Sequence, residues 1–524
     1  MQCRLASILA GLLLSGVGVA AGVPGTLVVV QSLDDIVSLD PAEGFELSSE
    51  SVFTSLYQRL VQSDPDKPGA LRATLASDWQ PGADGQSLVF TLRAGATFAG
   101  GHAVRPEDVV FSLQRAVRLN RSPAFILNEL GWTADNVAGF IVKTDDGHVR
   151  VSWPARVGTA FVLNVLSSTV ASIVDALEAD RHQVNNDSGN GWLHTHSEGS
   201  GPFRMRRYIP HEALVMDANP RAPLGAPLLK TVVIKNVADA ASRRLLVEVG
   251  DADIARDLGP DQIAALRGKP DLRVFESPSA SVHYLLFNGS NNAKPVLKNP
   301  ALWEAARWLI DYDGIAGKLL KGQYLVHQAF LAHGFPGALD TTPYHLDVPK
   351  AREILAKAGI APGTAITLDV FNQPPFNEIA QSLQATFAQG GIRLQILPGV
   401  ASEVYGKTRT RTEEAVWLYW IPDYYDAHST ASAFALNRED GTQSIAWRAG
   451  WHIAKLSAQT IAAVEERDPA ARIRDYEAIQ AEVQRSSPFV IALQERTELV
   501  MRSNVKGYRQ GLTAEMVYYD RVTR

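Results

Sequence analysis

The sequence predicts an α/β protein that is built from more than one lobe, and three observations lead to this fold class. The chain has 524 residues, whereas a single domain usually has about 100 to 200. Between 366 and 420, runs with strand character alternate with a helical pattern, which favours a mixed sheet with crossover helices. Clusters of turn-forming residues at 64–69 and 187–202 are suited to chain crossings between lobes.

The first 22 residues have the pattern of a signal peptide. Arg4 precedes an apolar stretch of about 15 residues, which is shorter than the ~20 that span a bilayer. Small residues then permit cleavage after Ala21 or Gly22. Cys3 is the only cysteine and lies before the apolar stretch, whereas a lipid-accepting cysteine directly follows it. We therefore expect a periplasmic protein that is exported through a cleavable signal peptide, 1–22, and is not a lipoprotein.

The composition and motifs argue against several function classes. A net charge of −6 without any basic tract argues against nucleic acid as a partner. Glu198 stands where a G-x-S-x-G nucleophile motif needs its first glycine. Gly399 and Gly406 are too widely spaced for a phosphate-binding loop, and His194 and His196 lack a third ligand at useful spacing. We expect no catalytic residue, no cofactor and no metal site.

The elements of the first half follow from local patterns. The apolar run 27–30 is typical of a buried strand, and apolar residues recur at helical spacing through 52–60. The sequence ADG at 83–85 favours a hairpin turn before the strand 87–93, whose inward face should hold Leu88, Phe90 and Leu92. A helix is expected from Pro106, with Val110, Leu113 and Val117 on its apolar face.

The second half continues as an alternation of strands and helices. Asp468 and Pro469 form a favourable helix start, followed by an apolar face with Ile473, Tyr476, Ile479 and Val483. Strands are expected at 231–236, 283–288, 366–371, 394–397 and 416–420, and helices at 301–311 and 378–389.

Several motifs resemble, in the same order, the pattern of bacterial extracellular solute-binding protein family 5. These are SLDP at 38–41, the stretch from LASDW to LQRAV at 75–117, EGSGPF at 198–203, GDADIARDL at 250–258, HYLLFN at 283–288 and ALWEAARWLID at 301–311. The resemblance implies a periplasmic binding protein type II-like fold, with two lobes that close over a cleft plus an extra third lobe. It also implies a monomeric receptor that binds a short peptide or other small solute and delivers it to the permease subunits of an ABC importer in the inner membrane.

The same resemblance implies a division of the chain into three lobes. Lobe I is discontinuous, lobe II is the extra domain, and lobe III closes against lobe I. The segments are 23–63, 197–285 and 498–524 for lobe I, 64–196 for lobe II, and 286–497 for lobe III.

The densest aromatic segment, VWLYWIPDYYD at 416–426, is the candidate ligand site. In peptide-binding members of the family, a tryptophan followed three residues later by an aspartate contacts the ligand, and the aspartate pairs with the peptide's α-ammonium. Trp420 and Asp423 match that spacing. A carboxylate in a dry cleft holds an ammonium with about 1.5 to 3 kcal/mol. The chain departs from the family's DYpDP pattern, because Ala427 replaces the proline.

The neighbours of Asp423 could complete such a site. The backbone of Tyr419 and Ile421 could pair with an extended peptide as an added strand. Trp417, Trp420 and Tyr424 could supply apolar walls. The alternative interpretation makes the two tryptophans core residues and lets Asp423 cap a turn.

Three other functions stay open from the sequence. The first is a receptor for a non-peptide solute, such as an opine, a saccharide or a metal chelate. The second is a periplasmic hydrolase, against which the missing nucleophile and metal cluster argue. The third is a chemosensory receptor, because such receptors reuse the same closing lobes.

Overall fold

The computed structural model describes residues 23–67, 69–437 and 444–524. The predicted signal peptide, 1–22, therefore lies outside the described residues. No helix among them has both the length and the apolar composition to cross a membrane.

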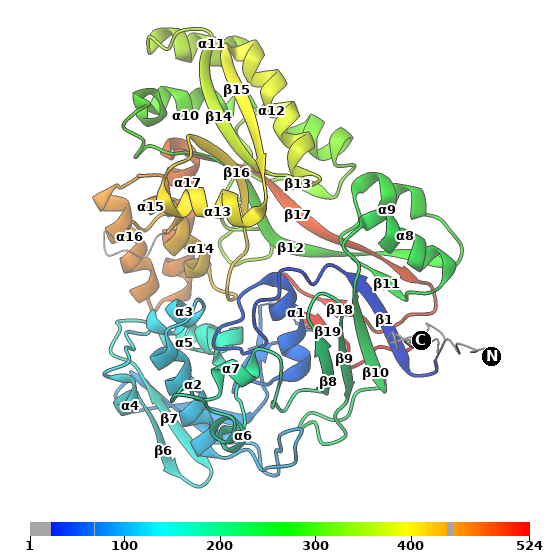
Figure 1. Cartoon of the computed structure of the whole chain (residues 1–524). Coiled ribbons are helices and arrows are strands. Elements are labelled where there is room, and N and C mark those ends of the chain that lie inside the picture. Colours follow the sequence, from blue (N-terminus) through cyan, green and yellow to red (C-terminus); the bar gives the residue numbers. More distant parts are fainter. Residues whose placement is uncertain (1–22, 68, 438–443) are drawn as a thin grey trace, which may run out of the picture.

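The main feature of the described chain is a mixed sheet of eleven strands (Figure 1). Its strands are β1 (Thr26–Gln31), β8 (Phe203–Ile209), β9 (Ala213–Ala218), β10 (Thr231–Asn236), β11 (Ile254–Ala255), β12 (Leu272–Phe287), β13 (Tyr324–Val326), β14 (Thr364–Phe371), β15 (Ile392–Gly399), β16 (Ala415–Trp420) and β17 (Phe489–Arg502). Their order is β15-β14-β16-β12-β17-β11-β1-β10-β9-β8, with β13 paired to β17. The predicted α/β fold class is confirmed.

Lobe I is organised around β1, which is buried along its whole length and runs parallel to both β10 and β11. Such burial on both faces explains the continuous apolar run of its sequence. The end of the chain contacts α1, because Thr54 Oγ1 donates to the backbone oxygen of Glu515 at 2.7 Å. The other elements of this lobe are α1 (Leu47–Leu56), α8 (Ala240–Val249), α9 (Pro260–Leu266), β18 (Arg509–Gln510) and β19 (Val517–Tyr518).

Lobe II holds a separate antiparallel sheet in the order β4-β5-β7-β6, made of β4 (Ala76–Pro81), β5 (Ser87–Leu92), β6 (Ile141–Asp145) and β7 (His148–Ser152). The expected hairpin lies between β4 and β5, with Gly85 at a φ of 65°. The helices and short pieces are β2 (Val61–Ser63), β3 (Leu71–Ala73), α2 (Pro106–Leu119), α3 (Ala124–Asn128), α4 (Val137–Phe140), α5 (Thr159–Leu166), η1 (Thr169–Ala171), α6 (Ala176–Arg181) and α7 (Asn190–Leu193). The apolar face predicted for α2 is partly wrong. Val110 was expected to be buried, but the fully buried residue is its neighbour Val109.

Lobe III packs helices on both faces of its part of the large sheet (Figure 1). Helix α17 begins as predicted, with the Asp468 side chain accepting from the Ala471 amide at 2.7 Å. The helices are η2 (Pro295–Lys298), α10 (Pro300–Arg307), η3 (Gly314–Leu319), α11 (Val348–Lys357), α12 (Phe376–Gly390), α13 (Ala401–Thr410), α14 (Ala427–Phe434), α15 (Ile445–Arg448), α16 (Ala454–Glu465) and α17 (Pro469–Ser486).

The two long strands β12 and β17 connect the halves of the large sheet. They pair from Leu272 opposite Arg502 to Leu286 opposite Phe489. The pairing shifts register between Pro278 and Val282, and such a bulge bends the strand that contains it. The lobe boundaries that the resemblance implies, between 285 and 286 and between 497 and 498, fall within β12 and β17, respectively.

The glycine turn of the EGSGPF motif lies against the end of α1. The Gly201 amide donates to the Leu56 carbonyl at 3.0 Å, and a Cβ at this position would overlap the carbonyl oxygen of Ser55. Replacing Gly201 with Ala should therefore lower the free energy of unfolding by about 1 to 3 kcal/mol, because packed backbone has no room for the methyl group. Chemical denaturation measures this. The control is Gly139→Ala, where no atom lies within 4 Å of the new Cβ; equal midpoints for both variants would contradict the prediction.

Candidate functional site

Asp423 lies in the loop that leads from β16 into α14. Its amide donates to Ser429 Oγ at 2.8 Å, which ties the loop to the helix. Three residues later, Asp426 caps α14 by accepting from the His428 amide at 2.8 Å, and the Arg472 guanidinium contacts both oxygens of this cap at 2.9 and 2.6 Å. Ala427, the departure from the family pattern, is the first residue of α14. Because proline is suited to that same helical position, its replacement by alanine need not alter the turn.

The carboxylate of Asp423 is only partly exposed and its surroundings are acidic. It makes no ion pair with any residue in the described part of the chain. Burial, and then the charges of Glu129 and Glu515, raise the pKa of Asp423 well above its usual range.

Two further carboxylates, from lobe I, lie near Asp423. Glu50 on α1 is 8% exposed, and its Oε1 accepts from Thr169 Oγ1 at 3.1 Å. Burial, followed by the charges of Glu515 and Asp423, raises the pKa of Glu50 well above its usual range. Glu515 follows β18 and is 4% exposed. Acidic groups of lobes I and III therefore influence one another's pKa.

The two tryptophans predicted to line the ligand site differ in how far they are buried. Trp417 is 0% exposed and packs in the lobe III core, with its ring centroid 6.4 Å from that of His283. Trp420 is partly exposed, packs edge-on against Phe434, and has a buried indole Nε1 without a hydrogen-bond partner among the described residues. The indole Nε1 of Trp417 is likewise buried without a partner in the described chain, so the two residues differ in exposure: Trp420 keeps some surface, whereas the side chain of Trp417 is enclosed.

The strand whose backbone was predicted to pair with a peptide, β16, is hydrogen-bonded along one edge and only partly along the other. Tyr419 pairs with His283 of β12, and the two rings stack at 5.5 Å. On its other side, β16 pairs with β14 only through Ala415 and Val416. Within the described chain, that second edge has no strand partner from Trp417 onward. Ile421 follows the strand and is partly exposed.

Tyr424 connects lobe III to lobe II. Its hydroxyl donates to Glu129 Oε2 at 2.5 Å, and its ring lies edge-on to Phe161 at 5.9 Å. Nearby, Asn164 Nδ2 donates to Asp426 Oδ2 at 3.2 Å. Tyr424 is 1% exposed and is therefore a contact between lobes in this structure.

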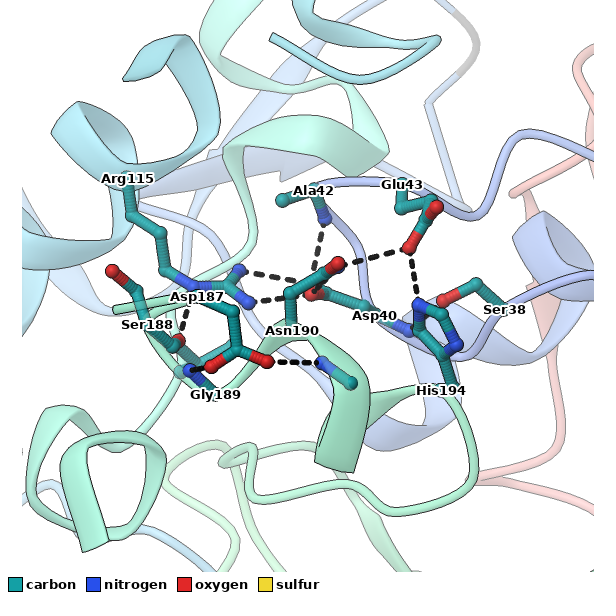
Figure 2. Close-up of polar contacts among 12 residues, drawn as sticks. Ser38, Asp40, Ala42, Glu43, Arg115, Asp187, Ser188, Gly189, Asn190 and His194 are labelled. Carbon is teal, nitrogen blue, oxygen red and sulfur yellow. Dashed lines mark hydrogen bonds and ion pairs between the residues drawn. The ribbon is translucent and has the colours of Figure 1, made fainter. Parts of the chain in front are cut away.

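The loop that precedes α1 is held by a buried polar network (Figure 2). Arg115 of α2 donates to both oxygens of Asp40 at 2.9 and 2.5 Å, and Asn190 Nδ2 donates to Asp40 Oδ2 at 2.7 Å and to Glu43 Oε2 at 2.9 Å. The Glu43 carboxylate also contacts His194 Nε2 at 2.5 Å. This network fixes the SLDP loop to lobe II and so positions the helix that bears Glu50.

Two histidines, His196 and His428, pack against aromatic rings. His196 stacks on Trp192 with ring centroids 4.6 Å apart, and His428 lies edge-on to Phe161 at 5.6 Å. Among the described residues, no group of three or more His, Cys, Asp or Glu side chains is placed to hold a metal ion.

A surface hollow of about 460 Å³ lies over α2 and is lined by Phe111, Gln114 and Arg118, among others. None of the predicted site residues contributes to it. The predicted residues are instead grouped around the loop after β16, where the lobes meet.

Sequence reasoning missed Glu50, Glu129 and Glu515. They stand on α1, after α3 and after β18, far from each other and from Asp423 along the chain. No local motif marks these three residues. The only indication for Glu515 was that the segment 498–524, which contains it, was expected to belong to lobe I.

Comparisons with known proteins agree with this architecture. The family model described as bacterial extracellular solute-binding proteins, family 5 middle, matches residues 70–442. A probable D,D-dipeptide-binding periplasmic protein of Escherichia coli K12, DdpA, is 28% identical over 503 residues, which cover 95% of this chain and 94% of that protein.

Solved structures share the fold at lower identity. DppA of Helicobacter pylori, in complex with the peptide STSA, has a TM-score of 0.80 and 22% identity, and the match covers 95% of this chain and 98% of that one. AgaA of Agrobacterium tumefaciens R10, in complex with agropinic acid, has a TM-score of 0.77 and 20% identity, with 94% and 96% covered. These matches confirm the type II periplasmic binding protein fold, which holds ligands of more than one class. The chain belongs to the bacterial extracellular solute-binding proteins of family 5.

Proposed function

We propose that this protein is the periplasmic receptor of an ABC importer and that it binds short peptides between lobes I and III. The α-ammonium of the peptide is held by Asp423, and Trp420 and the free edge of β16 contact the first residue. The single observation that carries the proposal is the Asp423 carboxylate, which is only partly exposed and has no ion-pair partner among the described residues. Buried charges in proteins are normally paired, so this carboxylate favours a cationic ligand group.

The contacts between lobes support binding that is coupled to closure. The contact of Tyr424 with Glu129 and that of Asn164 with Asp426 both join lobe III to lobe II. A ligand that touches both sides of the cleft binds the closed state more tightly and shifts the population toward it. The closed receptor would then present its peptide to the permease subunits in the inner membrane. The proposal includes a monomeric mature chain, cleaved after residue 21 or 22 and without a lipid anchor.

The relatives favour a peptide over the other solutes. DdpA is named as a probable D,D-dipeptide-binding protein, and DppA was solved with a tetrapeptide sequence, STSA. A free α-amino group is common to such ligands, and it is the group that Asp423 is suited to hold.

Titration calorimetry with the mature protein tests the proposal. A free dipeptide should bind at least about 30-fold more tightly than the same dipeptide with an acetylated amino group, because acetylation removes the charge that pairs with Asp423 and about 2 kcal/mol with it. Equal affinities would contradict ammonium recognition. Native mass spectrometry of protein purified without refolding would identify a retained opine, saccharide or metal chelate, and cleavage of the dipeptide would instead indicate a hydrolase.

A further inference from the structure

Two histidines contact each other in the connection 327–340, which follows β13. Nδ1 of His327 lies 3.1 Å from Nε2 of His333, and the ring centroids are 4.3 Å apart. The other nitrogen of each ring also has a partner: Nε2 of His327 contacts the carbonyl oxygen of Leu331 at 2.9 Å, and Nδ1 of His333 contacts Oδ1 of Asp340 at 2.8 Å. His327 is fully buried, whereas the side chain of His333 is 36% exposed.

The partners of the two rings determine where their protons lie. A carbonyl oxygen only accepts, so His327 carries a proton on Nε2. Burial, and then the charge of His333, lower the pKa of His327 to about 4, which leaves its Nδ1 as an acceptor near neutral pH. His333 must therefore donate from Nε2 to His327, and the carboxylate of Asp340 requires a donor at Nδ1 as well. Only the imidazolium form of His333 serves both partners, because a neutral imidazole has a single N–H group.

The side chains that meet this connection from other elements carry no charge near neutral pH. Tyr425 is the titratable one among them, and burial raises its pKa, so its hydroxyl keeps its proton. The histidine and the carboxylate on the neighbouring strands, His283 of β12 and Glu495 of β17, contact each other at 3.8 Å. The uncharged side chains are Gln494 of β17, Ile473 and Gln480 of α17, Leu512 of lobe I and Tyr425 of the loop after β16.

The backbone of His333 is fixed to the two strands that connect the halves of the large sheet. The His333 amide donates to Gln494 Oε1 at 2.9 Å, and Gln494 Nε2 donates to the His333 carbonyl at 3.3 Å. The same Nε2 donates to the carbonyl of Ser279 at 2.8 Å. Ser279 lies where the pairing of β12 shifts register, between Pro278 and Val282. Gln494 of β17 therefore joins His333 to the bend of β12.

The residues after His333 support the loop that bears Asp423. The hydroxyl of Tyr425 donates to the carbonyl of Gly334. The Tyr425 ring also stacks on Phe335, with ring centroids 4.4 Å apart. Tyr425 follows Asp423 by two residues, so a displacement of Gly334 and Phe335 would remove contacts that hold this loop in place.

We propose that His333 is a pH-sensitive anchor of the loop that bears Asp423. The protonated ring holds the connection 327–340 through His327 and Asp340, and loss of the proton releases one of these two contacts and loosens the support of Tyr425. The anchor is complete below the pH at which an imidazolium ordinarily loses its proton, about 6.5, and it is lost as the pH rises through that range. The effect on peptide affinity rests on the proposed function, whereas the effect on stability does not.

The test compares the mature wild-type protein with His333→Phe, which keeps a ring but has no N–H group. In titration calorimetry with a free dipeptide, the variant should bind about threefold more weakly or worse at about pH 5.5, and nearly as tightly as the wild type at about pH 8. Both proteins contain Asp423, so its own titration cancels in this ratio. The matched control is His148→Phe, because His148 contacts Asp145 at 2.7 Å in a similarly exposed pair of lobe II; its affinity should equal that of the wild type at both pH values.

Chemical denaturation gives a second measurement that needs no ligand. The wild type should be more stable than His333→Phe at about pH 5.5, and this difference should shrink by at least about half at about pH 8. An affinity ratio or a stability difference that is the same at both pH values would overturn the inference and leave the proposed function intact. If the dipeptide binds to neither protein, the proposed function fails, and denaturation alone decides on the anchor. Should His333→Phe not fold, as judged by circular dichroism, Asp340→Asn gives the same comparison, since the Asp340 side chain is 84% exposed.

Discussion

Replacing Asp423 with Asn should weaken peptide binding by about 30-fold or more. The substitution keeps the size of the side chain and removes the charge that pairs with the ligand ammonium, and charge-assisted hydrogen bonds contribute about 1.5 to 3 kcal/mol. In a closed cleft the loss lies at the upper end of this range, because an unpaired ammonium would be buried as well. Titration calorimetry with a free dipeptide measures the effect.

Asp475→Asn provides the control, since this carboxylate is exposed on α17 and its loss should leave affinity unchanged. The pH dependence gives a second check. Burial and the neighbouring carboxylates raise the pKa of Asp423, and only its ionised form pairs with an ammonium. Wild-type affinity should therefore decrease as the pH is lowered through that raised pKa, and the affinity of Asp423→Asn should lose this part of the dependence. If Asp423→Asn bound the dipeptide as tightly as the wild type does, the role of this carboxylate would be refuted.

Replacing Arg115 with Met should lower the free energy of unfolding by about 3 to 5 kcal/mol. The side chains of Arg115 and Asp40 are 2% and 0% exposed, so the substitution leaves a buried carboxylate without its cation (Figure 2). Asn190 would still donate to Asp40, but an amide does not neutralise the charge. Chemical denaturation at neutral pH, followed by circular dichroism, measures the change.

The matched control is the exposed ion pair of Arg206 with Asp217, in which the arginine side chain is 54% exposed. Arg206→Met should change stability by less than about 1 kcal/mol, because exposed ion pairs contribute little. The double variant Asp40→Asn with Arg115→Met should recover part of the loss, since it removes the uncompensated charge. If Arg115→Met were as stable as Arg206→Met, the network of Figure 2 would not be what holds the SLDP loop to lobe II.

Most elements of the fold could be predicted because their signals are local. The strand 231–236 coincides with β10, and Asp468 with Pro469 marks the start of α17. The length of a strand and the identity of its pairing partners were harder to predict. The expected strand 283–288 is the end of the much longer β12, whose first half has an irregular polar pattern and is stabilised by pairing with β17. On α2, the buried face is rotated toward Val109, because the packing of neighbouring elements decides which side of the apolar stripe is covered.

The candidate site could be predicted only in part for a similar reason. Trp420 and Asp423 stand in one short segment, where spacing alone indicates a site. Glu50 and Glu515 are 465 positions apart and come together only because the chain end returns to pack against α1. Trp417 belongs to the same motif as Trp420, but its side chain faces the lobe III core.

The sequence by itself determined the α/β class, the family and the segment that contains Asp423, because periodicity, turn residues and short motifs are properties of neighbouring residues. Tertiary structure decided which charges meet. It placed Asp40 beside Arg115 and Asn190, and it brought the charges of Glu515 and Asp423 near enough to Glu50 to raise the pKa of that carboxyl. Electrostatic interactions act through space and depend on burial, so the balance of charge in the cleft is set by the folded arrangement of distant segments.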